Sequence, residues 1–497
     1  MSGHQVAPSV PPRADWFPES PLLQTVLQYL ARNFGRTYLV GGTVRDLIAG
    51  RRRHGDVDFT VSQGSGLHIA RRVADRFAGA YYPLDPERGT GRAILHDAAG
   101  RLELDFAQLR EPDMEADLAG RDFTVNALAL DIRSGQLLDP TDGLADLRAG
   151  RLRAVSPRVF CDDPVRLLRA PRQAVELGLE IGQATRAQIV RDAPRLRAAS
   201  AERLRDEVCR LLALPNGATQ LPGLDALGLL TEVWPELAAL KGLAQPHPHR
   251  YDAFTHTLQA VAEMEQLLSL IAGDAAPDEP ALAEFRPDLA AYVQTTLSSD
   301  RPLSLLLKLA ALFHDLGKPA SHTVGDDGRV HFYGHARIGA DLAGQAMKRL
   351  RFATAEERWL VAVARHHMRP LNFVNQGGAS RRAIYRFYRD AGDAGVGATL
   401  LSLADARATW GQDLTPDRWQ DHTRMASRLF AAYFEARERM VSPPALITGR
   451  DVIDHLSIAP GPEIGRLLEA VREAQAVGDV STREEALALV RRRVSGA

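Results

Sequence analysis

The pattern of apolar residues changes once along this chain, near residue 144, and that change limits the folds open to it. From Leu22 to Asp139, short apolar runs rich in β-branched residues alternate with stretches of helical spacing such as Leu67 to Phe77. This alternation is typical of a small domain in which strands and helices pack together. The predicted strands are Thr37 to Val40, Val57 to Val61, Leu102 to Phe106 and Ala127 to Ile132.

After Leu144 strand patterns nearly disappear. Segments rich in Arg, Ala and Leu, with apolar residues three and four positions apart, predict helices for the remainder. The sequence therefore predicts an α+β protein, with a small sheet-containing domain followed by a mostly α-helical region. Breaks between elements are expected at Leu212 to Gly223, Gly273 to Asp288 (as an exposed acidic loop near residue 280), Gly325 to Gly334 and Ser442 to Gly449.

Length and composition exclude several classes of protein. A chain of 497 residues predicts two to four domains. Its Pro-rich start reads as a loose tail rather than a targeting signal, and apolar runs such as Leu303 to Phe313 are too short to cross a membrane. Two cysteines, Cys161 and Cys209, cannot form a multi-disulfide framework, and a net charge of -1 argues against a uniformly basic surface. We expect a soluble, cytoplasmic protein.

A glycine pair marks the first candidate site. In YLVGGTVRDLIAG, the predicted strand ends at Gly41 and Gly42, and a helix is expected to begin at Thr43. Glycines allow close backbone approach, and the free N–H groups at a helix start favour an anion such as phosphate. Arg45 would add a charge-assisted contact. By itself, this pattern is also compatible with a turn that binds no ligand.

Two aspartates follow on the next predicted strand. Asp56 and Asp58 are two residues apart, so both carboxylates project from the same face of the strand. Their mutual repulsion would be relieved by a divalent cation, and Mg²⁺ prefers oxygen ligands together with substrate phosphates. A third carboxylate is expected on a neighbouring strand, where Glu103 and Asp105 share one face. Periodicity does not choose between those two.

These motifs carry a resemblance to a known family. In order and spacing they are similar to bacterial class II tRNA nucleotidyltransferases and poly(A) polymerases over roughly Tyr38 to Leu212. The matching motifs are GGTVRD with GDVDF, RDFTVNALALD (Arg121 to Asp131) with DPTDGLADL (Asp139 to Leu147), and DDPVRLLRAPRQA (Asp162 to Ala174).

The resemblance implies a polymerase-β-type nucleotidyltransferase head with a mixed sheet. It implies that Asp56 and Asp58 hold catalytic Mg²⁺ and that Asp105, rather than Glu103, is the third acidic position. It also implies that the triphosphate or ribose is contacted by Gly42, Arg45 and Arg121.

A polar series follows at three-residue spacing, at Asp163, Arg166, Arg169 and Arg172. On a helix these residues would share one face, and a solvated ion-pair face is the simple interpretation. The family resemblance instead implies that Asp163 and Arg166 read the incoming base and that Arg169 and Arg172 support nucleotide binding. Arg supplies donors and a carboxylate supplies acceptors, so the pair can match the edges of C and A.

Two features around this series depart from the simple pattern. Pro171 lies inside the predicted helix and is expected to kink it before Arg172. The following segment, Ala199 to Ala213, resembles the family's neck helix, in which we expect Glu202 and Glu207 to be structural rather than catalytic.

A second site is indicated by ordered His and Asp motifs. AFTHTLQAV, LAALFHDLGKP, YGHARIGADLA, ARHHMRP and LSLADARATWG resemble an HD phosphohydrolase domain over roughly Tyr251 to Gly411. The resemblance implies a metal set of His256, His314, Asp315 and Asp405, with Mn, Ni, Co or Mg as candidate metals. His335 and one of His366 or His367 are further candidates, for a second metal or for phosphate.

The expected domains are a disordered tail (1–20), the nucleotidyltransferase head (21–145), a helical neck for base recognition and RNA binding (146–220), the HD domain (221–430) and a helical C-terminal tail (431–497). In that tail Gly461 and Pro462 are expected to start a helix that contacts the tRNA elbow together with Arg466, a packing helix being the alternative.

The leading functional hypothesis is CCA addition to tRNA from CTP and ATP. The alternatives are CC-adding, A-adding or poly(A) polymerase activity, a mainly HD-dependent phosphatase or 2′,3′-cyclic phosphodiesterase, and a non-catalytic RNA-binding protein. The sequence does not indicate an oligomeric state.

Overall fold

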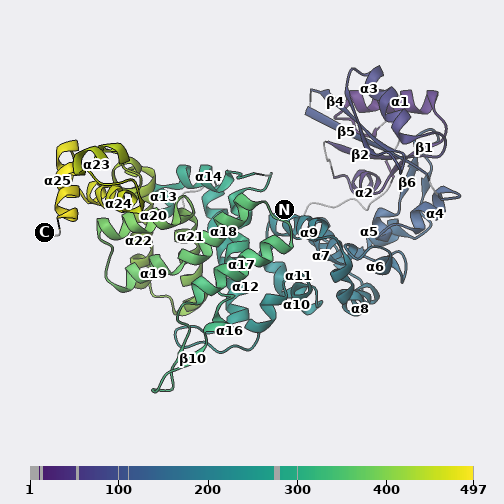
Figure 1. Cartoon of the computed structure of the whole chain (residues 1–497). Coiled ribbons are helices and arrows are strands. Elements are labelled where there is room, and N and C mark those ends of the chain that lie inside the picture. The colour runs from purple at the N-terminus through teal and green to yellow at the C-terminus, as the bar shows by residue number, and fades with distance from the viewer. Residues whose placement is uncertain are drawn as a thin grey trace. The chain divides into compact units, whose positions relative to one another are not determined.

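The computed structural model describes residues 10–11, 15–51, 55–98, 100–109, 111–273, 280–298 and 300–495. The chain forms two compact units (Figure 1). The head unit comprises Met1–Glu207 with Ala226–Glu232, and the helical unit comprises Val208–Asp225 with Val233–Ala497. Helix α9 (Ala201–Ala213) runs from the first unit into the second.

A seven-stranded mixed sheet forms the centre of the head unit, with strand order β3-β4-β5-β2-β1-β6-β7. Neighbouring strands are antiparallel except β2 and β5, which run parallel. The strands are β1 (Thr37–Val40), β2 (Asp56–Val61), β3 (Ala80–Asp85), β4 (Thr90–Asp97), β5 (Gly100–Gln108), β6 (Ala129–Asp131) and β7 (Leu137–Leu138).

Helices α1 (Pro21–Asn33), α2 (Gly42–Ile48) and α3 (Gly66–Arg76) contribute apolar side chains to the core against this sheet. In α3 the buried residues Ile69, Ala70, Val73 and Ala74 recur at helical spacing, which gives the helix one apolar face. At the centre of the core, Phe59 of β2 stacks on Phe106 of β5 with ring centroids 4.7 Å apart. The core therefore fixes β2 against β5.

The head core begins earlier than the predicted boundary at residue 21. Residues 1–9 and 12–14 of the predicted tail lie outside the described residues. Trp16 and Phe17, however, are buried in the head core, and Trp16 Nε1 donates to the Pro11 carbonyl oxygen. For residues 15–20 the expected disorder is wrong, because a large aromatic side chain finds apolar partners there.

The rest of the head unit is mainly short helices. These are α4 (Met114–Ala119), α5 (Gly143–Arg148), α6 (Val159–Asp162), α7 (Arg166–Leu177) and α8 (Gln183–Asp192), with a small parallel pair of strands, β8 (Arg151–Leu152) and β9 (Glu180–Ile181).

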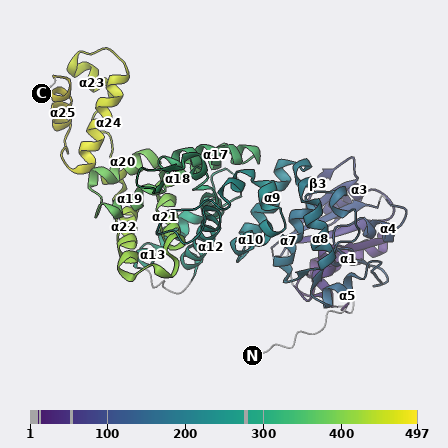
Figure 2. The ribbon, with the colours of Figure 1, turned by 90° about the horizontal axis from the view of Figure 1, so that it is seen from below.

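Helix α21 (Ala394–Trp410) is central to the helical unit. Nearly all of its residues are buried, as expected for a helix that is apolar on every face. It packs against α12 (Ala253–Ala272) and α18 (Thr354–His366), which are labelled beside it in Figure 2, and against α15 (Leu303–Phe313). Most of α11 (Leu230–Val233) belongs to the head unit. The other helices and strands of the helical unit are α10 (Leu221–Ala226), α13 (Pro280–Glu284), α14 (Arg286–Gln294), α16 (Lys318–Ser321), the hairpin β10 (Thr323–Val324) and β11 (Val330–His331), α17 (His335–Arg349), α19 (Met368–Asn375), α20 (Arg381–Ala391) and α22 (Pro416–Phe434).

Lys308, the charge inside the apolar run of α15, has a structural role. Its Nζ donates to Glu265 Oε1 of α12 at 2.5 Å and to the Leu212 carbonyl oxygen of α9 at 2.7 Å. All three groups are buried, so pairing is required to offset desolvation.

The C-terminal helices α23 (Gly449–Leu456), α24 (Pro462–Val477) and α25 (Arg483–Val494) share a small apolar core of their own, visible as a separate group in Figure 2. Arginines of α20 form ion pairs with glutamates of α24, as in Arg386 to Glu473 at 2.7 Å. Gly461 and Pro462 do start a helix, as predicted, because Pro is favoured at the first helical position.

The α+β prediction is confirmed, and all four predicted strands fall on observed ones. Strands β3 and β4 were not predicted. The loop expected over Gly273 to Asp288 is wrong in part, since α13 begins at Pro280 and α14 at Arg286, although residues 274–279 lie outside the described residues.

Candidate functional site

The glycine turn connects β1 to α2. Gly41 has φ +65°, a conformation that L side chains rarely adopt, and a Cβ there would lie 2.9 Å from Arg121 Nη1. Arg121 therefore lies across the turn, and the positive φ of Gly41 is what favours glycine there, because the end of the arginine side chain could move away from a Cβ. Arg121 is also held by Asp117, with Nη2 to Oδ2 at 3.1 Å.

Arg45 is buried beneath the turn rather than extended into solvent. Its Nε donates to Asp46 Oδ1 at 2.8 Å, and its Nη1 donates to Asn126 Oδ1 at 2.5 Å. A Cβ on Gly42 would lie 3.3 Å from Arg45 Nη2, so this guanidinium closes against the helix start. The turn is thus lined by two arginines, Arg45 and Arg121.

The predicted carboxylates converge on adjacent strands. The parallel register of β2 and β5 places Asp56 opposite Glu103 and Asp58 opposite Asp105. Residues that alternate along paired strands share one face, so four carboxylates lie together. The register pairs each candidate with one aspartate and so does not choose between Asp105 and Glu103 as the third member.

Arg92 of β4 balances part of this negative charge. Its Nε and Nη2 donate to the two carboxylate oxygens of Asp105 at 2.7 and 2.8 Å, and its Nη1 donates to Glu103. Glu103 also pairs with Arg101 at 2.6 Å. Glu103 is therefore paired with two arginines, whereas Asp56 and Asp58 stay at solvent-accessible positions.

The environment of Asp58 favours its protonated form. Desolvation by the surrounding sheet, followed by the charge of Asp105, raises the pKa of Asp58 to about 6, against the lowering effect of Arg121. Although the side chain reaches solvent, the sheet surrounds it closely enough to disfavour a lone charge. A divalent cation would stabilise the charged form of Asp58, because its positive charge would offset both the desolvation of the carboxylate and the repulsion from Asp105.

One hydrogen bond joins the strand of carboxylates to the glycine turn. The backbone N–H of Asp58 donates to Thr43 Oγ1 at 3.0 Å, and Thr43 is in the first turn of α2. The carboxylates and the turn are therefore two sides of one site. Sequence reasoning did not assign Thr43, although it lies inside the quoted GGTVRD motif.

Asp163 lies in the turn before α7, not on the helix as its spacing suggested. It has extended backbone angles at the end of α6, and α7 begins at Arg166. Arg203 of α9 donates to both of its carboxylate oxygens, at 3.0 and 2.6 Å. Burial would raise the pKa of Asp163, but the hydrogen bonds and charge of Arg203 outweigh it and lower that pKa.

The side chain of Arg166 extends toward the backbone at Gly120 and Arg121. Its guanidinium donates to the carbonyl oxygens of Gly120 at 3.1 Å and of Arg121 at 3.3 Å, and its Nε lies 3.9 Å from Asp163 Oδ2. The two proposed base-reading side chains are therefore neighbours. Helix α7 continues through Pro171 to Leu177 as one element.

Arg169 and Arg172 share one buried carboxylate, Glu207 of α9, at 3.2 and 2.6 Å. Arg169 also contacts Asp122 at 3.2 Å, and Arg172 contacts Glu176 at 2.6 Å. This chain of ion pairs fixes α7 to α9.

A second cluster lies in the helical unit. His256 comes from α12, the adjacent His314 and Asp315 follow α15, and Asp405 comes from α21. His256 Nε2 lies 3.0 Å from Asp405 Oδ1 and 3.4 Å from Asp315 Oδ2, and His314 Nε2 lies 3.1 Å from Asp315 Oδ2. All four predicted metal ligands are brought together.

Two further histidines complete the cluster. His335 Nε2 lies 3.5 Å from Asp315 Oδ1, and the buried His367 ring lies 5.1 Å from that of His314. Burial, with the charges of His314 and His335, lowers the pKa of His367 to about 3. His366 is not a member, so the choice between the two neighbours falls on His367.

The donor set fits a bound cation. In His314, His335 and His367 the Nδ1 atom lies 2.6–2.8 Å from a backbone carbonyl oxygen, which leaves Nε2 directed into the cluster. The Nε2 atoms of His335 and His367 are buried without a hydrogen-bond partner, and His314 Nε2 faces Asp315 Oδ2. The possible ligand groups, each with atoms within 4.8 Å of one another, are His256–His314–Asp315, His314–His367–Asp405 and Asp315–His335–His367.

The sequence also matches known families. Residues 37–153 match the family described as "Poly A polymerase head domain", residues 178–241 the "Probable RNA and SrmB- binding site of polymerase A", and residues 263–410 the "HD domain". The A-adding tRNA nucleotidyltransferase of Deinococcus radiodurans is 34% identical over 91% of this chain and 94% of its own length. The chain belongs to the tRNA nucleotidyltransferase family.

Other members of the tRNA nucleotidyltransferase family are similarly close. The CC-adding enzyme of Thermus thermophilus is 33% identical over 91% of this chain and 92% of its own length. The multifunctional CCA protein of Nitrosococcus oceani is 30% identical over 80% of this chain and 90% of its own length. A CCA-adding enzyme solved with CTP has the same fold, with a TM-score of 0.63 at 19% identity over 96% of each chain.

Two residues that the motifs did not assign lie at the histidine–aspartate cluster of this nucleotidyltransferase. Lys318 Nζ lies 2.5 Å from Asp315 Oδ2, and the His249 ring lies 5.1 Å from that of His256. Lys318 is part of the quoted HDLGKP and could have been noted there, whereas His249 precedes the first motif.

Among the described helices, none has the length and apolar content that crossing a bilayer requires.

Proposed function

We propose that this chain adds CCA to the 3′ end of tRNA, taking CMP from CTP and AMP from ATP and releasing pyrophosphate. The observation that carries the proposal is the Asp58 to Thr43 hydrogen bond of 3.0 Å, which joins a carboxylate strand to a phosphate-type turn. This arrangement suits attack of a hydroxyl on a nucleoside triphosphate. Membership of the tRNA nucleotidyltransferase family gives tRNA as the acceptor.

In this reaction the tRNA 3′ oxygen forms a bond to the α-phosphorus of the nucleotide. The bond from that phosphorus to the bridging oxygen breaks, pyrophosphate leaves with the electron pair, and the hydroxyl proton is released. Asp56 and Asp58 would hold Mg²⁺, with Asp105 beside them, and a bound ion would supply stabilisation of the negative charge that develops on the reacting phosphate. Catalysis then depends mainly on alignment.

The turn would receive the triphosphate. Gly42 offers its backbone at the start of α2, and Arg121 lies across the turn where its guanidinium can reach phosphate oxygens or the ribose. Arg45, buried against Asp46 and Asn126, would act from beneath the turn as a fixed positive charge.

Base selection is assigned to Asp163 and Arg166. Their side chains are neighbours and offer acceptors and donors that match the edges of C and A. Because Asp163 and Arg166 would read both C and A, these two side chains must be held in place. The hydrogen bonds of Asp163 with Arg203 and of Arg166 with the backbone of residues 120–121 would do so. Arg169 and Arg172 would support the nucleotide indirectly, through their contacts with Glu207.

A partial product is the main competing proposal. The relatives at 34% and 33% identity are named A-adding and CC-adding enzymes, and the multifunctional CCA protein is 30% identical. The head geometry is compatible with each, and also with a poly(A) polymerase.

The histidine–aspartate cluster supports a second proposed activity, metal-dependent hydrolysis of phosphate esters, as a phosphatase or 2′,3′-cyclic phosphodiesterase. His256, His314, Asp315 and Asp405 would hold Mn, Ni, Co or Mg. Such a metal would lower the pKa of bound water. His335 and His367 extend the ligand set toward a second ion or a phosphate.

Three further expectations stay proposals. The first is the division into the nucleotidyltransferase head (21–145), the neck (146–220), the HD domain (221–430) and the C-terminal tail (431–497). The second is a cytoplasmic location. The third is contact of the C-terminal tail with the tRNA elbow near Gly461 and Arg466. Arg466 lies at an exposed position, paired with Glu463 at 2.8 Å.

The test is incorporation of labelled CMP and AMP into tRNA that lacks CCA, tRNA that ends in CC, and an unrelated RNA. Addition of C, C and A to the first substrate supports CCA addition. Addition of only C or only A supports the partial activities, and addition of A to every RNA supports a poly(A) polymerase.

A further inference from the structure

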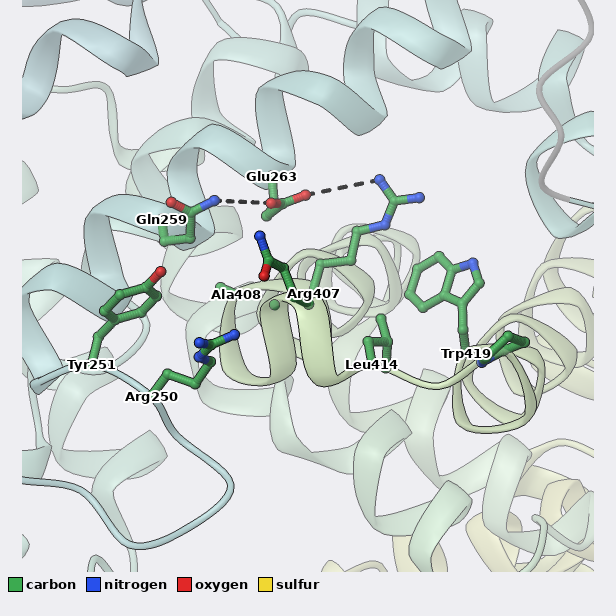
Figure 3. A pocket seen from close by; sticks show the side chains of 11 residues that line it. Arg250, Tyr251, Gln259, Glu263, Arg407, Ala408, Leu414 and Trp419 are labelled. Atoms are coloured by element: carbon green, nitrogen blue, oxygen red, sulfur yellow. Dashed lines mark hydrogen bonds and ion pairs between the residues drawn. The ribbon is translucent and has the colours of Figure 1, made fainter.

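Polar side chains around a pocket of the helical unit satisfy one another. Gln259 Nε2 donates to Glu263 Oε1 at 2.9 Å, and Glu263 Oε2 pairs with Arg407 at 3.8 Å, as the dashed lines in Figure 3 show. A hydrogen-bonded group in the head unit differs from this one, because it joins two parts of the proposed nucleotide site. The side chains at its centre are Asn126 and Gln173.

Asn126 is buried beside the glycine turn, where its backbone oxygen would lie 3.9 Å from a Cβ on Gly41. Its side-chain Oδ1 accepts from Arg45 Nη1 at 2.5 Å. Its Nδ2 donates to Asp122 Oδ1 at 2.9 Å and to Gln173 Oε1 at 2.8 Å. Arg offers only donors and a carboxylate accepts, so one orientation of the Asn126 amide satisfies all three partners. These bonds fix the amide in that orientation.

The segment 120–126 is hydrogen-bonded to α7 at three positions of that helix. Arg166 donates to the first two carbonyl oxygens of the segment, Arg169 donates to its aspartate, and Gln173 accepts from its last residue. Helical residues at positions i, i+3 and i+7 lie on one face. Gln173 is therefore the contact that extends the attachment toward the C-terminal half of α7.

The same segment carries the contacts proposed for the triphosphate. Arg121 lies across the turn, with Nη1 2.9 Å from the position of a Cβ on Gly41. Asn126 holds Arg45 beneath the turn. The segment is thus attached both to the turn and to the helix that begins at Arg166. A nucleotide with its phosphates at the turn and its base at Arg166 would span this segment.

We propose that Asn126 and Gln173 are positioning residues, which fix the spacing between the glycine turn and α7 so that both ends of a nucleoside triphosphate are bound at once. The inference rests on the proposed function, which assigns the turn to the triphosphate and Asp163 and Arg166 to the base. Two linked groups gain affinity over the separate groups only where the spacing of the two subsites matches that of the ligand.

Calorimetry on the full-length protein, with Mg²⁺ and without RNA, tests the role of Gln173 with three probes: CTP, CMP and pyrophosphate. Gln173→Leu removes the acceptor for Asn126 at a half-buried position. It should weaken CTP binding by about threefold to tenfold, the effect of one hydrogen bond, and leave CMP and pyrophosphate binding unchanged. Gln28→Leu, the same substitution at an exposed glutamine of α1, should leave all three unchanged.

Two outcomes with Gln173→Leu overturn the inference. One is a CTP affinity equal to that of the wild type. The other is a loss of CMP or pyrophosphate affinity by the same factor as CTP, because the residue would then act within one subsite rather than on the spacing. Wild-type protein that does not bind CTP contradicts the proposed function itself, and the inference falls with it.

A double variant tests the path through Asn126. Asn126→Ala removes the bonds to Arg45, Asp122 and Gln173 and should weaken CTP binding more than Gln173→Leu does. Because Gln173 is proposed to act through Asn126, adding Gln173→Leu to Asn126→Ala should weaken CTP binding no further. Losses that multiply in the double variant contradict the inference. Thermal unfolding checks the fold, and if Asn126→Ala does not fold, the comparison of Gln173→Leu with Gln28→Leu decides.

Discussion

Arg203 donates two hydrogen bonds to Asp163, at 3.0 and 2.6 Å, and so connects the neck helix α9 to a residue proposed to read the base. Asp163 lies in a turn, where its position depends on such contacts, rather than on a rigid helix. Base selection is therefore expected to depend on α9, which does not itself carry the proposed base-reading pair.

Replacing Arg203 tests this dependence. Arg203→Ala should raise the KM for CTP and ATP by roughly threefold to tenfold, because a partly exposed charged hydrogen bond is lost. It should also reduce discrimination against UTP, since Asp163 becomes mobile. Steady-state kinetics with CTP, ATP and UTP measure both effects. Arg186→Gln, at an exposed arginine of α8, should change neither, and an Arg203→Ala enzyme with unaltered selectivity would refute the positioning role.

Glu207 is predicted to be structural. It is 4% exposed and receives both Arg169 and Arg172, so Glu207→Ala leaves two guanidinium groups without their shared partner. The expected cost is about 3 kcal/mol, a typical value for breaking a buried pair. That corresponds to a Tm lower by roughly 5–10 °C in thermal unfolding.

The control for that experiment is on the same helix. Glu202 is exposed, and Glu202→Ala should leave the Tm within about 1 °C of the parent value. If both variants unfold at the parent temperature, Glu207 does not stabilise the contact between α7 and α9.

Asp451 gives the C-terminal helices a pH dependence. The hydrogen bonds of the Thr448 backbone, then of Arg483, lower its pKa to about 2 from an ordinary value of 3.8. A lowered pKa stabilises the fold above the ordinary value, and that stabilisation is lost as the pH falls toward 2. Wild-type protein should therefore lose more Tm between pH 5 and 2 than Asp451→Asn does.

Asp454 supplies the comparison, because it is exposed and its contact with Arg450 is long, at 3.8 Å. Asp454→Asn should follow the wild-type pH dependence. Parallel curves for wild type and Asp451→Asn would show that the cap at Thr448 contributes nothing to stability.

The two sites should be separable. His314→Ala removes a ligand common to two of the three possible metal groups, so metal content measured by mass spectrometry should fall, while CMP and AMP incorporation should persist. His366→Ala, next to the cluster but outside it, should keep the metal. Loss of nucleotide addition in a folded His314→Ala protein would contradict the two-site proposal.

Local patterns predicted those parts of the molecule that depend on neighbours in sequence. The strand of Asp56 and Asp58 follows from two-residue alternation, and the glycine turn from backbone freedom. Strand β3 escaped prediction because it is an edge strand whose residues are largely exposed, as in Tyr82 at 52%. An edge strand has no continuous apolar pattern to detect.

Long-range pairing explains the remaining differences. The three-residue spacing of Asp163 and Arg166 suggested one helix face, but the helix starts only at Arg166 and Arg203 holds Asp163 from forty residues away. The choice of His367 over His366 likewise depends on which side chain faces Asp315 across the helical unit. Sequence spacing carries no information on such contacts.

The central claim rests on Asp56 and Asp58. Labelled CTP and ATP, supplied separately and together, are incubated with tRNA that lacks CCA. Three proteins are compared: the wild type, Asp56→Ala, and the control Asp75→Asn on the exposed face of α3. The account predicts two CMP and one AMP per tRNA for wild type and control, and at least a thousandfold slower incorporation for Asp56→Ala, with tRNA binding retained. Undiminished incorporation by Asp56→Ala would contradict it.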